Sequence, residues 1–366
     1  MGQPLRVGMV GVGAISGQYL STFERLATVR PDVVRLVAVA DLDTARAEAA
    51  AAEQGVRALT VDELTTDPDV DLVLNLTIPA AHAEVALKAI AAGKHVYGEK
   101  PLAATLADAR TVLDAARAAG VRVGCAPDTV LGTGVQTARA AIDGGAIGEP
   151  VAATATMMTP GHERWHPNPD FYYQPGGGPL LDMGPYYVTT LVTLLGPVVS
   201  VVGAASHTRD TRVIGSGPRA GEVIPVDVDT HVTGVLRHAS GALSTLVMSF
   251  DAVATRASEI EVHGQTGSLV VPDPNRFDGD VRLHELGGDW KTLPPSAGYR
   301  DAGRGYGVAD LAATPPDVPV RASGDVAYHV LDIMTALLTA AGSGGTVAVE
   351  STVERPAAVP LADAPR

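Results

Sequence analysis

The chain has 366 residues, of which 46% are hydrophobic and 19% charged, a length that favours two globular domains over one. Its formal net charge of −14 argues against a nucleic-acid-binding protein, because such a protein needs a basic face to neutralise phosphates. Cys125 is the only cysteine, so no intrachain disulfide can form, and we interpret it as a small buried residue.

The first 125 residues alternate predicted strands with predicted helices. We expect strands at residues 5–10, 33–40, 70–77, 95–98 and 121–125, and helices at 15–27, 44–54, 62–65, 80–92 and 106–119. The strands are almost continuously apolar, which is typical of a parallel sheet covered by helices on both faces. Residues 1–125 are therefore predicted to form a dinucleotide-binding Rossmann domain with a doubly wound parallel sheet, so the fold is of the α/β class.

From residue 126 the pattern changes. We expect a helix at 130–143, a strand at 150–158, a polar-aromatic loop at 159–178, a helix at 185–195, strands at 198–207, 228–237, 242–250, 258–263 and 268–272, and a long helix at 325–341. Successive strands joined by short turns predict a large open, mainly antiparallel sheet. We assign residues 126–356 to this second, α+β domain and residues 357–366 to a tail.

No membrane or export segment is expected. Gly196 and Pro197 interrupt the most apolar stretch, residues 186–205, and only four residues precede the first predicted strand. We therefore expect a cytoplasmic protein.

A glycine-rich turn joins the first predicted strand to the first predicted helix. Gly11 and Gly13 would let the backbone turn tightly and approach a pyrophosphate, which would rest on amides at the helix N-terminus. The strict dinucleotide pattern has glycine or alanine where Ser16 stands, and Gly17 follows it. Alone, the motif leaves an ordinary tight turn as the alternative.

Other polar residues follow the ends of neighbouring strands. Asp41 ends the second strand, from which a carboxylate can accept hydrogen bonds from an adenosine ribose; a helix N-cap is its alternative role. With Asp43 nearby, NAD is favoured over NADP, although Arg46 could compensate a 2′-phosphate. Thr77 and Lys100 follow the next two strands, and parallel strands end at one edge of a sheet, so we expect a ligand there.

The run Glu99-Lys100-Pro101 places an ammonium where it could contact both a nicotinamide and the hydroxyl to be oxidised. From position alone, a generic surface lysine is the alternative. Further along, Asp182 and Tyr186 are four residues apart and would share one face of a helix. Asp182 could instead only cap that helix.

The loop at residues 161–173 contains two histidines, an arginine and four aromatic residues. This set suits stacking and hydrogen bonding to a sugar ring, although a packed loop at a subunit contact is the alternative. His162 and His166 have a spacing seen in zinc sites, but no third ligand is placed, so we predict no metal site.

The glycine turn, Glu99-Lys100-Pro101 and Asp182-x-Gly184-x-Tyr186 together resemble the Gfo/Idh/MocA family, which includes relatives of glucose–fructose oxidoreductase and inositol dehydrogenase. The resemblance runs from about residue 5 to residue 356 and includes residues 75–82, 148–150 and 321–324. It implies a Rossmann domain and a second domain whose large sheet makes oligomers, here a homodimer or homotetramer.

The resemblance also implies roles for single residues. Lys100 would contact substrate and nicotinamide, and Asp182 would orient the substrate. The family commonly has a general-base histidine where Tyr186 stands, although glucose–fructose oxidoreductase also resembles this chain in using tyrosine. A tyrosine has a pKa of about 10, so we hypothesise that Lys100 lowers the pKa of Tyr186, which then takes the hydroxyl proton. His166 is the reserve base.

The sequence therefore predicts an NAD-dependent oxidoreductase, with NADP possible, that acts on a sugar, polyol or related cyclic compound and has no nucleic-acid or membrane partner. The alternatives are an enzyme that recycles tightly bound NAD to cleave a glycoside or invert a centre, and a non-catalytic nucleotide-binding sensor. The predicted cofactor contacts are Gly11, Gly13, Ala14, Ile15, Asp41, Thr77, Pro79, His82, Glu99 and Lys100, and the predicted substrate contacts are Lys100, Trp165, His166, Tyr173, Asp182 and Tyr186.

Overall fold

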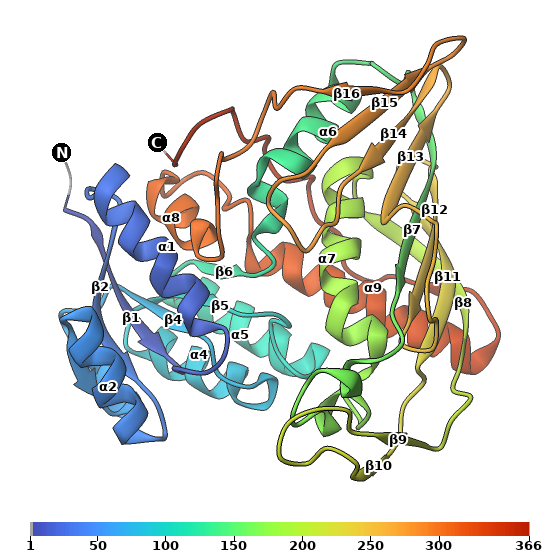
Figure 1. The fold of residues 1–366 in the computed structure, drawn as a ribbon. Coiled ribbons are helices and arrows are strands. Elements are labelled where there is room, and N and C mark those ends of the chain that lie inside the picture. Colours follow the sequence, from blue (N-terminus) through green and yellow to red (C-terminus); the bar gives the residue numbers. More distant parts are fainter. Residues whose placement is uncertain (1–2, 366) are drawn as a thin grey trace. The chain divides into compact units, whose positions relative to one another are not determined.

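The computed structural model describes residues 3–365, which form two compact units (Figure 1). The first unit contains the chain up to Gln136, Ala297–Tyr328 and the stretch from Pro356; the second contains Thr137–Ser296 and His329–Arg355. A segment beyond the second unit's strands thus returns to the first unit, which the alternating pattern of the first 125 residues does not indicate. The domain boundaries expected from the sequence stay a prediction.

The first unit is built on a six-stranded sheet in the order β3-β2-β1-β4-β5-β6, and all neighbouring strands are parallel. The strands are β1 (Leu5–Val10), β2 (Val34–Ala40), β3 (Arg57–Leu59), β4 (Leu72–Asn75), β5 (His95–Gly98) and β6 (Val123–Cys125). The predicted Rossmann-type parallel sheet is confirmed. The three-residue edge strand β3 was not predicted, because it is too short to show an apolar run.

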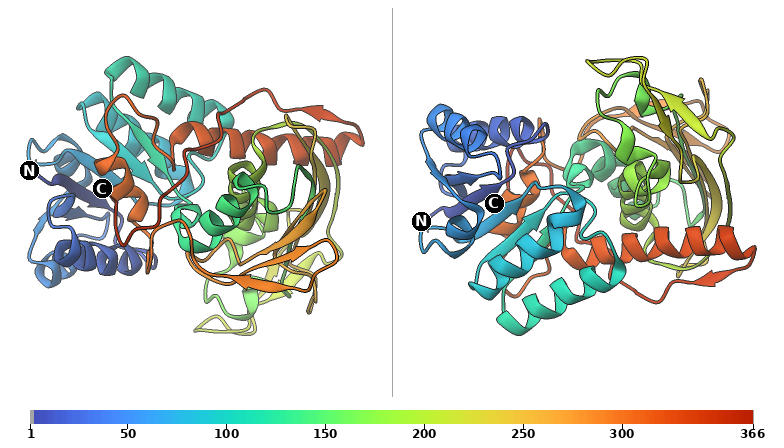
Figure 2. Two further views of the ribbon diagram at one scale, coloured as in Figure 1. Left: turned by 90° about the horizontal axis from the view of Figure 1, so that it is seen from above. Right: turned by 90° about the horizontal axis from the view of Figure 1, so that it is seen from below.

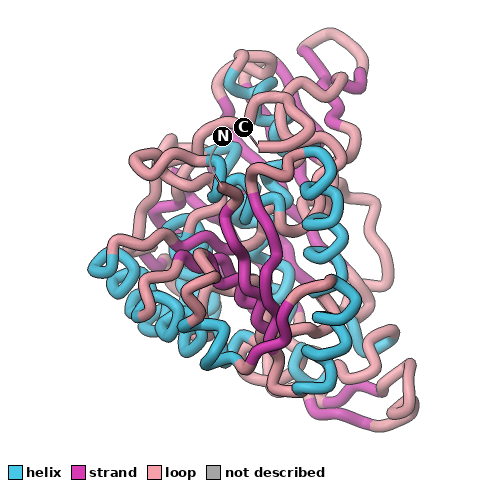
Figure 3. The backbone as a smooth tube through the Cα atoms, turned by 90° about the vertical axis from the view of Figure 1, so that its left-hand side faces the viewer, coloured by secondary structure: helices cyan, strands magenta, loops and turns pink. Residues whose placement is uncertain are grey.

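Helices cover both faces of this sheet (Figure 3). They are α1 (Ser16–Val29), α2 (Thr44–Gln54), α3 (Val61–Thr66), α4 (His82–Ala91), α5 (Leu106–Ala119) and α8 (Tyr306–Ala313). α1 and α2 lie on one face, and α4 and α5 lie on the other (Figure 2). Gly55 and Gly120 end α2 and α5 in the left-handed conformation, with φ of 65° and 67°, which glycine adopts readily at the end of a helix.

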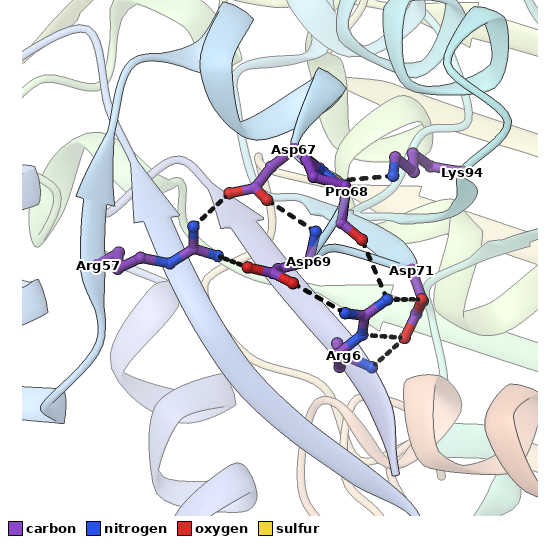
Figure 4. Close-up of polar contacts among 7 residues, drawn as sticks. All are labelled: Arg6, Arg57, Asp67, Pro68, Asp69, Asp71 and Lys94. Carbon is purple, nitrogen blue, oxygen red and sulfur yellow. Dashed lines mark hydrogen bonds and ion pairs between the residues drawn. The ribbon is translucent and has the colours of Figure 1, made fainter. Parts of the chain in front are cut away.

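Ion pairs connect the strands at the amino edge of this sheet (Figure 4). Arg6 on β1 donates to both carboxylate oxygens of Asp71, at 2.9 and 2.7 Å, and contacts Asp69 at 3.1 Å. Arg57 on β3 pairs with Asp67 at 2.7 Å. The hydrogen bond from Arg6 lowers the pKa of Asp71, because it stabilises the carboxylate.

The second unit contains a nine-stranded sheet in the order β16-β15-β14-β13-β7-β12-β11-β8-β17. Its strands are β7 (Pro150–Met158), β8 (Val198–Ser206), β11 (His231–His238), β12 (Leu243–Ser249), β13 (Ile260–Gly264), β14 (Gly267–Val271), β15 (Val281–Glu285), β16 (Lys291–Leu293) and β17 (Val347–Ala348). Only β7 and β12 pair in parallel, which confirms the predicted large, mainly antiparallel sheet. β9 (Thr211–Val213) and β10 (Val223–Pro225) form a separate hairpin.

Helix α7 (Gly178–Leu195) packs against β7, β11 and β12. We call the sheet face that it covers the inner face and the opposite one the outer face. α9 (Gly324–Ser343) packs on the inner face through Leu337, where glycine is required on two neighbouring strands. A Cβ on Gly203 or on Gly234 would lie 2.6 or 2.4 Å from Leu337 Cδ1. The remaining long helix, α6 (Thr133–Asp143), leads into β7.

Within residues 3–365, α9 alone is long and apolar enough by composition to cross a membrane. In its most apolar window, however, 56% of the residues are buried inside the structure, including Leu337 and His329. This burial is typical of the core helix of a globular protein.

Candidate active site

The glycine turn lies at the carboxyl end of β1. Gly11 has φ of +98°, and a Cβ there would lie 2.7 Å from the carbonyl of Leu76, so both the conformation and the close approach require glycine. A Cβ on Gly13 would meet no atom within 4 Å, so this side of the turn is open. Ser16, the departure from the strict pattern, donates its hydroxyl to the carbonyl of Gly13 at 2.8 Å and is accommodated in this way.

Asp41 is a partner of the glycine turn. One of its carboxylate oxygens accepts the N–H of Val12 at 2.7 Å, and the other accepts the N–H of Asp43 at 2.9 Å. The N-cap of α2 is Asp43, which accepts the N–H of Arg46. The N-cap alternative for Asp41 is therefore wrong, and its carboxylate is fixed beside the turn at the end of β2.

Two exposed aliphatic residues lie on either side of β1. Leu42, 94% exposed, follows β2, and Ile78, 70% exposed, follows β4; within the described part of the first unit they are the most exposed large hydrophobic residues. Exposed apolar side chains at strand ends offer a surface to a flat ring such as adenine. We did not predict these residues, although an apolar residue directly after a strand-ending polar group is a signal that could have found them.

The loop after β5 is fixed from several sides. The hydroxyl of the buried Tyr19 on α1 donates to the Glu99 carboxylate at 2.7 Å, and that carboxylate also accepts the N–H of Lys100 at 3.1 Å. The N–H of Glu99 donates to the carbonyl of Asn75 at 2.9 Å. Glu99 therefore orders the backbone that carries Lys100. Cys125 is buried beneath the loop, and burial raises the pKa of its thiol, which fits the predicted structural role.

The predicted cofactor contacts after β4 differ in accessibility. Pro79 is exposed and Thr77 is half-buried, with its hydroxyl donating to Asn75 Oδ1 at 2.6 Å. His82 is buried, and both of its ring nitrogens face backbone carbonyls, those of Pro101 at 2.6 Å and Thr77 at 3.0 Å. The imidazole is therefore engaged inside the protein.

In the second unit, α7 begins at Gly178, seven residues before the predicted start, and its N-cap is Gly177. Asp182 therefore lies inside the helix, and the N-cap alternative for it is wrong. Tyr186 follows one helical turn later, so the two side chains share a face as expected. Asp182 is half-buried, and Tyr186 is buried.

The carboxylate of Asp182 has a partner that we did not predict as a site residue. His162 Nε2 lies 3.2 Å from Asp182 Oδ2. The imidazole is surrounded by the rings of Trp165, Tyr172 and Phe250, with centroids 5.2, 4.7 and 4.4 Å away. This pairing depends on how the loop folds over α7, so the spacing of residues in the sequence gives no signal for it.

The aromatic loop has an exposed part and a buried part. Trp165 and Phe171 are 59% and 54% exposed, and the ring of His166 lies between them, 5.4 Å from each. Burial lowers the pKa of His166. Tyr173 is fully buried and donates its hydroxyl to Glu163, so its position does not favour the predicted substrate contact.

A buried arginine holds the aromatic loop, residues 161–173, in place through an ion pair. Arg212 on β9 is almost completely buried and forms ion pairs with Glu163 at 3.2 Å and Asp251 at 2.6 Å. Asp251 also accepts the hydroxyl of Thr230 at 2.5 Å. Both carboxylates are thus satisfied by buried donors, which such charges require.

The returning segment of the first unit packs on α1. The buried carboxylate of Asp128 accepts the N–H groups of Gly305 and Gly307 at 2.8 and 2.9 Å, at the start of α8. Burial raises the pKa of Asp128 to about 6. Arg304 donates to the side chain of Gln18 on α1 at 3.1 Å. Residues far along the chain thus complete the unit around the helix that follows the glycine turn.

Among residues 3–365 no group of three or more His, Cys, Asp or Glu side chains could hold a metal ion. The two histidines with zinc-like spacing have separate partners: His162 lies against Asp182, and His166 Nδ1 accepts the N–H of Asn168 at 3.1 Å. The expectation of a metal-free site stays a prediction.

Comparison with known proteins matches both parts of the chain. Residues 5–126 match the model of the GFO_IDH_MocA family, described as an oxidoreductase family with an NAD-binding Rossmann fold, and residues 135–270 match the GFO/IDH/MocA C-terminal domain. The chain is 33% identical over 272 residues to the 1,5-anhydro-D-fructose reductase of Ensifer adhaerens, covering 72% of this chain and 75% of that protein.

Two further similarities point the same way. The myo-inositol 2-dehydrogenase of Thermotoga maritima is 30% identical over 267 residues, covering 72% of this chain and 74% of that protein. The crystal structure of an NAD-binding oxidoreductase from Klebsiella pneumoniae superposes with a TM-score of 0.83 at 28% identity, covering 94% of this chain and 99% of that one.

Proposed function

Because the chain belongs to the GFO/IDH/MocA family of NAD-binding oxidoreductases, we propose that it transfers hydride between NAD and a hydroxyl-bearing carbon of a sugar, polyol or related cyclic substrate. The observation that carries this proposal is the carboxyl edge of the six-stranded sheet. There the Gly11 turn, the Asp41 carboxylate and the Glu99-Lys100 loop follow the ends of β1, β2 and β5. In parallel α/β sheets this edge is where ligands bind.

The residues at this edge fit a dinucleotide. The open side of the turn at Gly13 leaves backbone N–H groups for a pyrophosphate, Asp41 suits a ribose, and Leu42 and Ile78 suit the adenine. When bound, NAD supplies the hydride acceptor of the oxidation. Asp41 favours NAD over NADP, because a 2′-phosphate would lie near a fixed carboxylate.

Side chains of the protein bind the substrate and transfer the proton of its reacting hydroxyl. Lys100 binds the reacting hydroxyl, and Asp182, fixed by His162, accepts a hydrogen bond from another substrate hydroxyl. Tyr186 transfers the proton; in the direction of reduction its phenol is the proton donor. The exposed rings of Trp165 and Phe171 offer an aromatic surface to the apolar face of a sugar.

A substrate panel tests this function. The purified full chain is mixed with sugars and inositols, in the presence of NAD or NADP, and the absorbance of the reduced nicotinamide is followed. We expect at least one compound to produce NADH. Binding of NAD with no turnover of any compound would support the sensor alternative. Retention of nucleotide through purification, with product formed but no net NADH, would support the recycled-cofactor alternative.

We also propose that a second copy of the chain covers the outer face of the nine-stranded sheet, giving a homodimer or homotetramer. The outward residues of its central strands include exposed aliphatic or small side chains, among them Val202 on β8 and Leu243 and Thr245 on β12. Analytical ultracentrifugation should find an oligomer that Val202→Glu dissociates. A monomeric wild type would contradict this.

With Cys125 as its one, buried cysteine, we place the enzyme in the reducing cytoplasm.

A further inference from the structure

His82, the first residue of α4, lies between two segments of the carboxyl edge. Its Nδ1 is 2.6 Å from the carbonyl oxygen of Pro101, which directly follows Lys100, and its Nε2 is 3.0 Å from the carbonyl oxygen of Thr77 at the end of β4. The side chain is buried, and each of its two ring nitrogens therefore has a backbone carbonyl as its partner.

The chemistry of these contacts identifies the donor. A backbone carbonyl only accepts hydrogen bonds, so each contact is favourable only when the ring nitrogen facing it carries a proton. Without a proton between them, two lone pairs would face each other at 2.6 Å, slightly less than the usual N–H···O distance of about 2.7–3.2 Å. The contact with Pro101 therefore requires Nδ1–H.

Asn75 completes the connection between the two segments. Its side-chain amide donates to the carbonyl of His82 at 3.0 Å, and its side-chain oxygen accepts the N–H and hydroxyl of Thr77 at 3.3 and 2.6 Å. Its own carbonyl accepts the N–H of Glu99 at 2.9 Å. The end of β4 and the loop that carries Lys100 are thus joined on one side of Lys100 by Asn75 and on the other by His82.

We propose that His82 is a positioning residue that fixes the Lys100 loop through an Nδ1–H hydrogen bond to the Pro101 carbonyl, and that it does not bind the cofactor. Its kinetic consequence rests on the proposed function, because it assumes that Lys100 acts on the substrate. Its structural content, the protonated Nδ1 and the ordered loop, does not depend on any activity.

Nitrogen NMR of the wild type tests the structural content directly. In protein labelled with ¹⁵N at histidine, assigned by comparison with a His82→Asn sample, we expect the His82 Nδ1 resonance to be that of a protonated nitrogen. A bare Nδ1 with the proton on Nε2 would overturn the proposal, since the ring would then serve Thr77 alone.

Two substitutions separate the two contacts. In His82→Asn the amide nitrogen is attached to Cγ, as Nδ1 is, and can still donate to Pro101. In His82→Gln it is one atom further out and can reach only the side facing Thr77. We expect kcat to fall about 10- to 100-fold in His82→Gln because the lysine is misplaced, and to be largely rescued in His82→Asn. The Kd for NADH should stay within about twofold in both, since no cofactor contact is lost.

His95→Asn is the matched control, because His95 begins β5 at the opposite edge, where its Nδ1 accepts the N–H of Arg122 at 3.0 Å. We expect it to keep the wild-type kcat. Equal losses of kcat in His82→Asn and His82→Gln, or a weakened Kd for NADH with kcat unchanged, would refute the positioning role. We expect backbone amide hydrogen exchange over residues 99–105 to be faster in His82→Gln alone. Because this measurement needs no turnover, it tests the positioning of the loop even if the wild type proves inactive.

Discussion

The two edges of the six-stranded sheet use polar side chains in different ways. At the amino edge, Arg6 and Arg57 form ion pairs with three aspartates of one loop (Figure 4). At the carboxyl edge, Asp41 and His82 contact backbone N–H or carbonyl groups, and Gly13 is open. Oppositely charged side chains that pair with each other stabilise a loop, whereas an open glycine turn beside a fixed carboxylate offers a surface to a ligand. The difference therefore distinguishes the stabilising edge from the functional one.

Lys100→Met is expected to have the largest effect. Removal of the ammonium should lower kcat by about 10²- to 10³-fold, because it takes away an electrostatic contact to the reacting oxygen. The matched control is Lys94→Met at the amino edge, where Lys94 donates to the carbonyl of Asp67 at 2.8 Å. Steady-state kinetics of both variants test the comparison, and equal activities would remove the functional distinction between the edges.

Tyr186→Phe and His166→Ala identify the proton-transfer residue. We expect Tyr186→Phe to slow single-turnover hydride transfer by about 100-fold, as for loss of a general acid or base. His166→Ala should change this rate by less than about threefold, because the ring packs between Trp165 and Phe171 and has no assigned proton to move. An unimpaired Tyr186→Phe enzyme would refute the assignment of Tyr186.

Asp41→Ser should change cofactor preference. The serine removes the charge at the end of β2, so we expect the ratio of kcat/KM for NAD to that for NADP to fall by about 10-fold. Asp71→Ser at the amino edge removes a carboxylate of the same kind and serves as the control. A ratio that stays constant in Asp41→Ser would show that this carboxylate does not face the ribose.

Arg6→Ala is expected to affect stability alone. It should lower Tm by about 2 °C near neutral pH and leave kcat unchanged, since the ion pairs are partly exposed. The pKa of Asp71 is lower in the folded protein than in the unfolded chain, so the stability from this pair is present above the unfolded pKa and is lost as the pH falls through the folded pKa. The Tm difference should shrink in acid; a constant difference would contradict this account.

The sequence predicts an element of the first unit well where neighbouring residues alone determine its ends. α5 and β5 have the predicted bounds, because Thr105 and Gly120 cap the helix and a short apolar run forms the strand. The start of α7 was missed because Gly176 and Gly177 indicate a loop, although Pro179 is favourable in a first helical turn. α8 was missed because its N-terminus is satisfied by Asp128, which is distant in the sequence.

The same limit applies to the candidate site. The positions of Asp41 and Lys100 at strand ends follow from the order of elements, so the sequence was sufficient to place them. The partner of Asp182 was not predictable, because His162 reaches it through a loop whose course depends on the buried Arg212 and its ion pair with Glu163. Tyr173 was expected to contact the substrate, because the aromatic composition of the loop does not show which of its rings is buried.

Hydride transfer itself is the most direct measurement. The full chain is incubated with NADH carrying deuterium at the transferable position of C4 and with carbonyl forms of sugars and inositols, and the alcohols are analysed by mass spectrometry. The account predicts an alcohol that carries the deuterium on its newly reduced carbon. In the same incubation time, Lys100→Met should form much less of this alcohol. Alcohols without deuterium, or none formed while NADH remains bound, would contradict it.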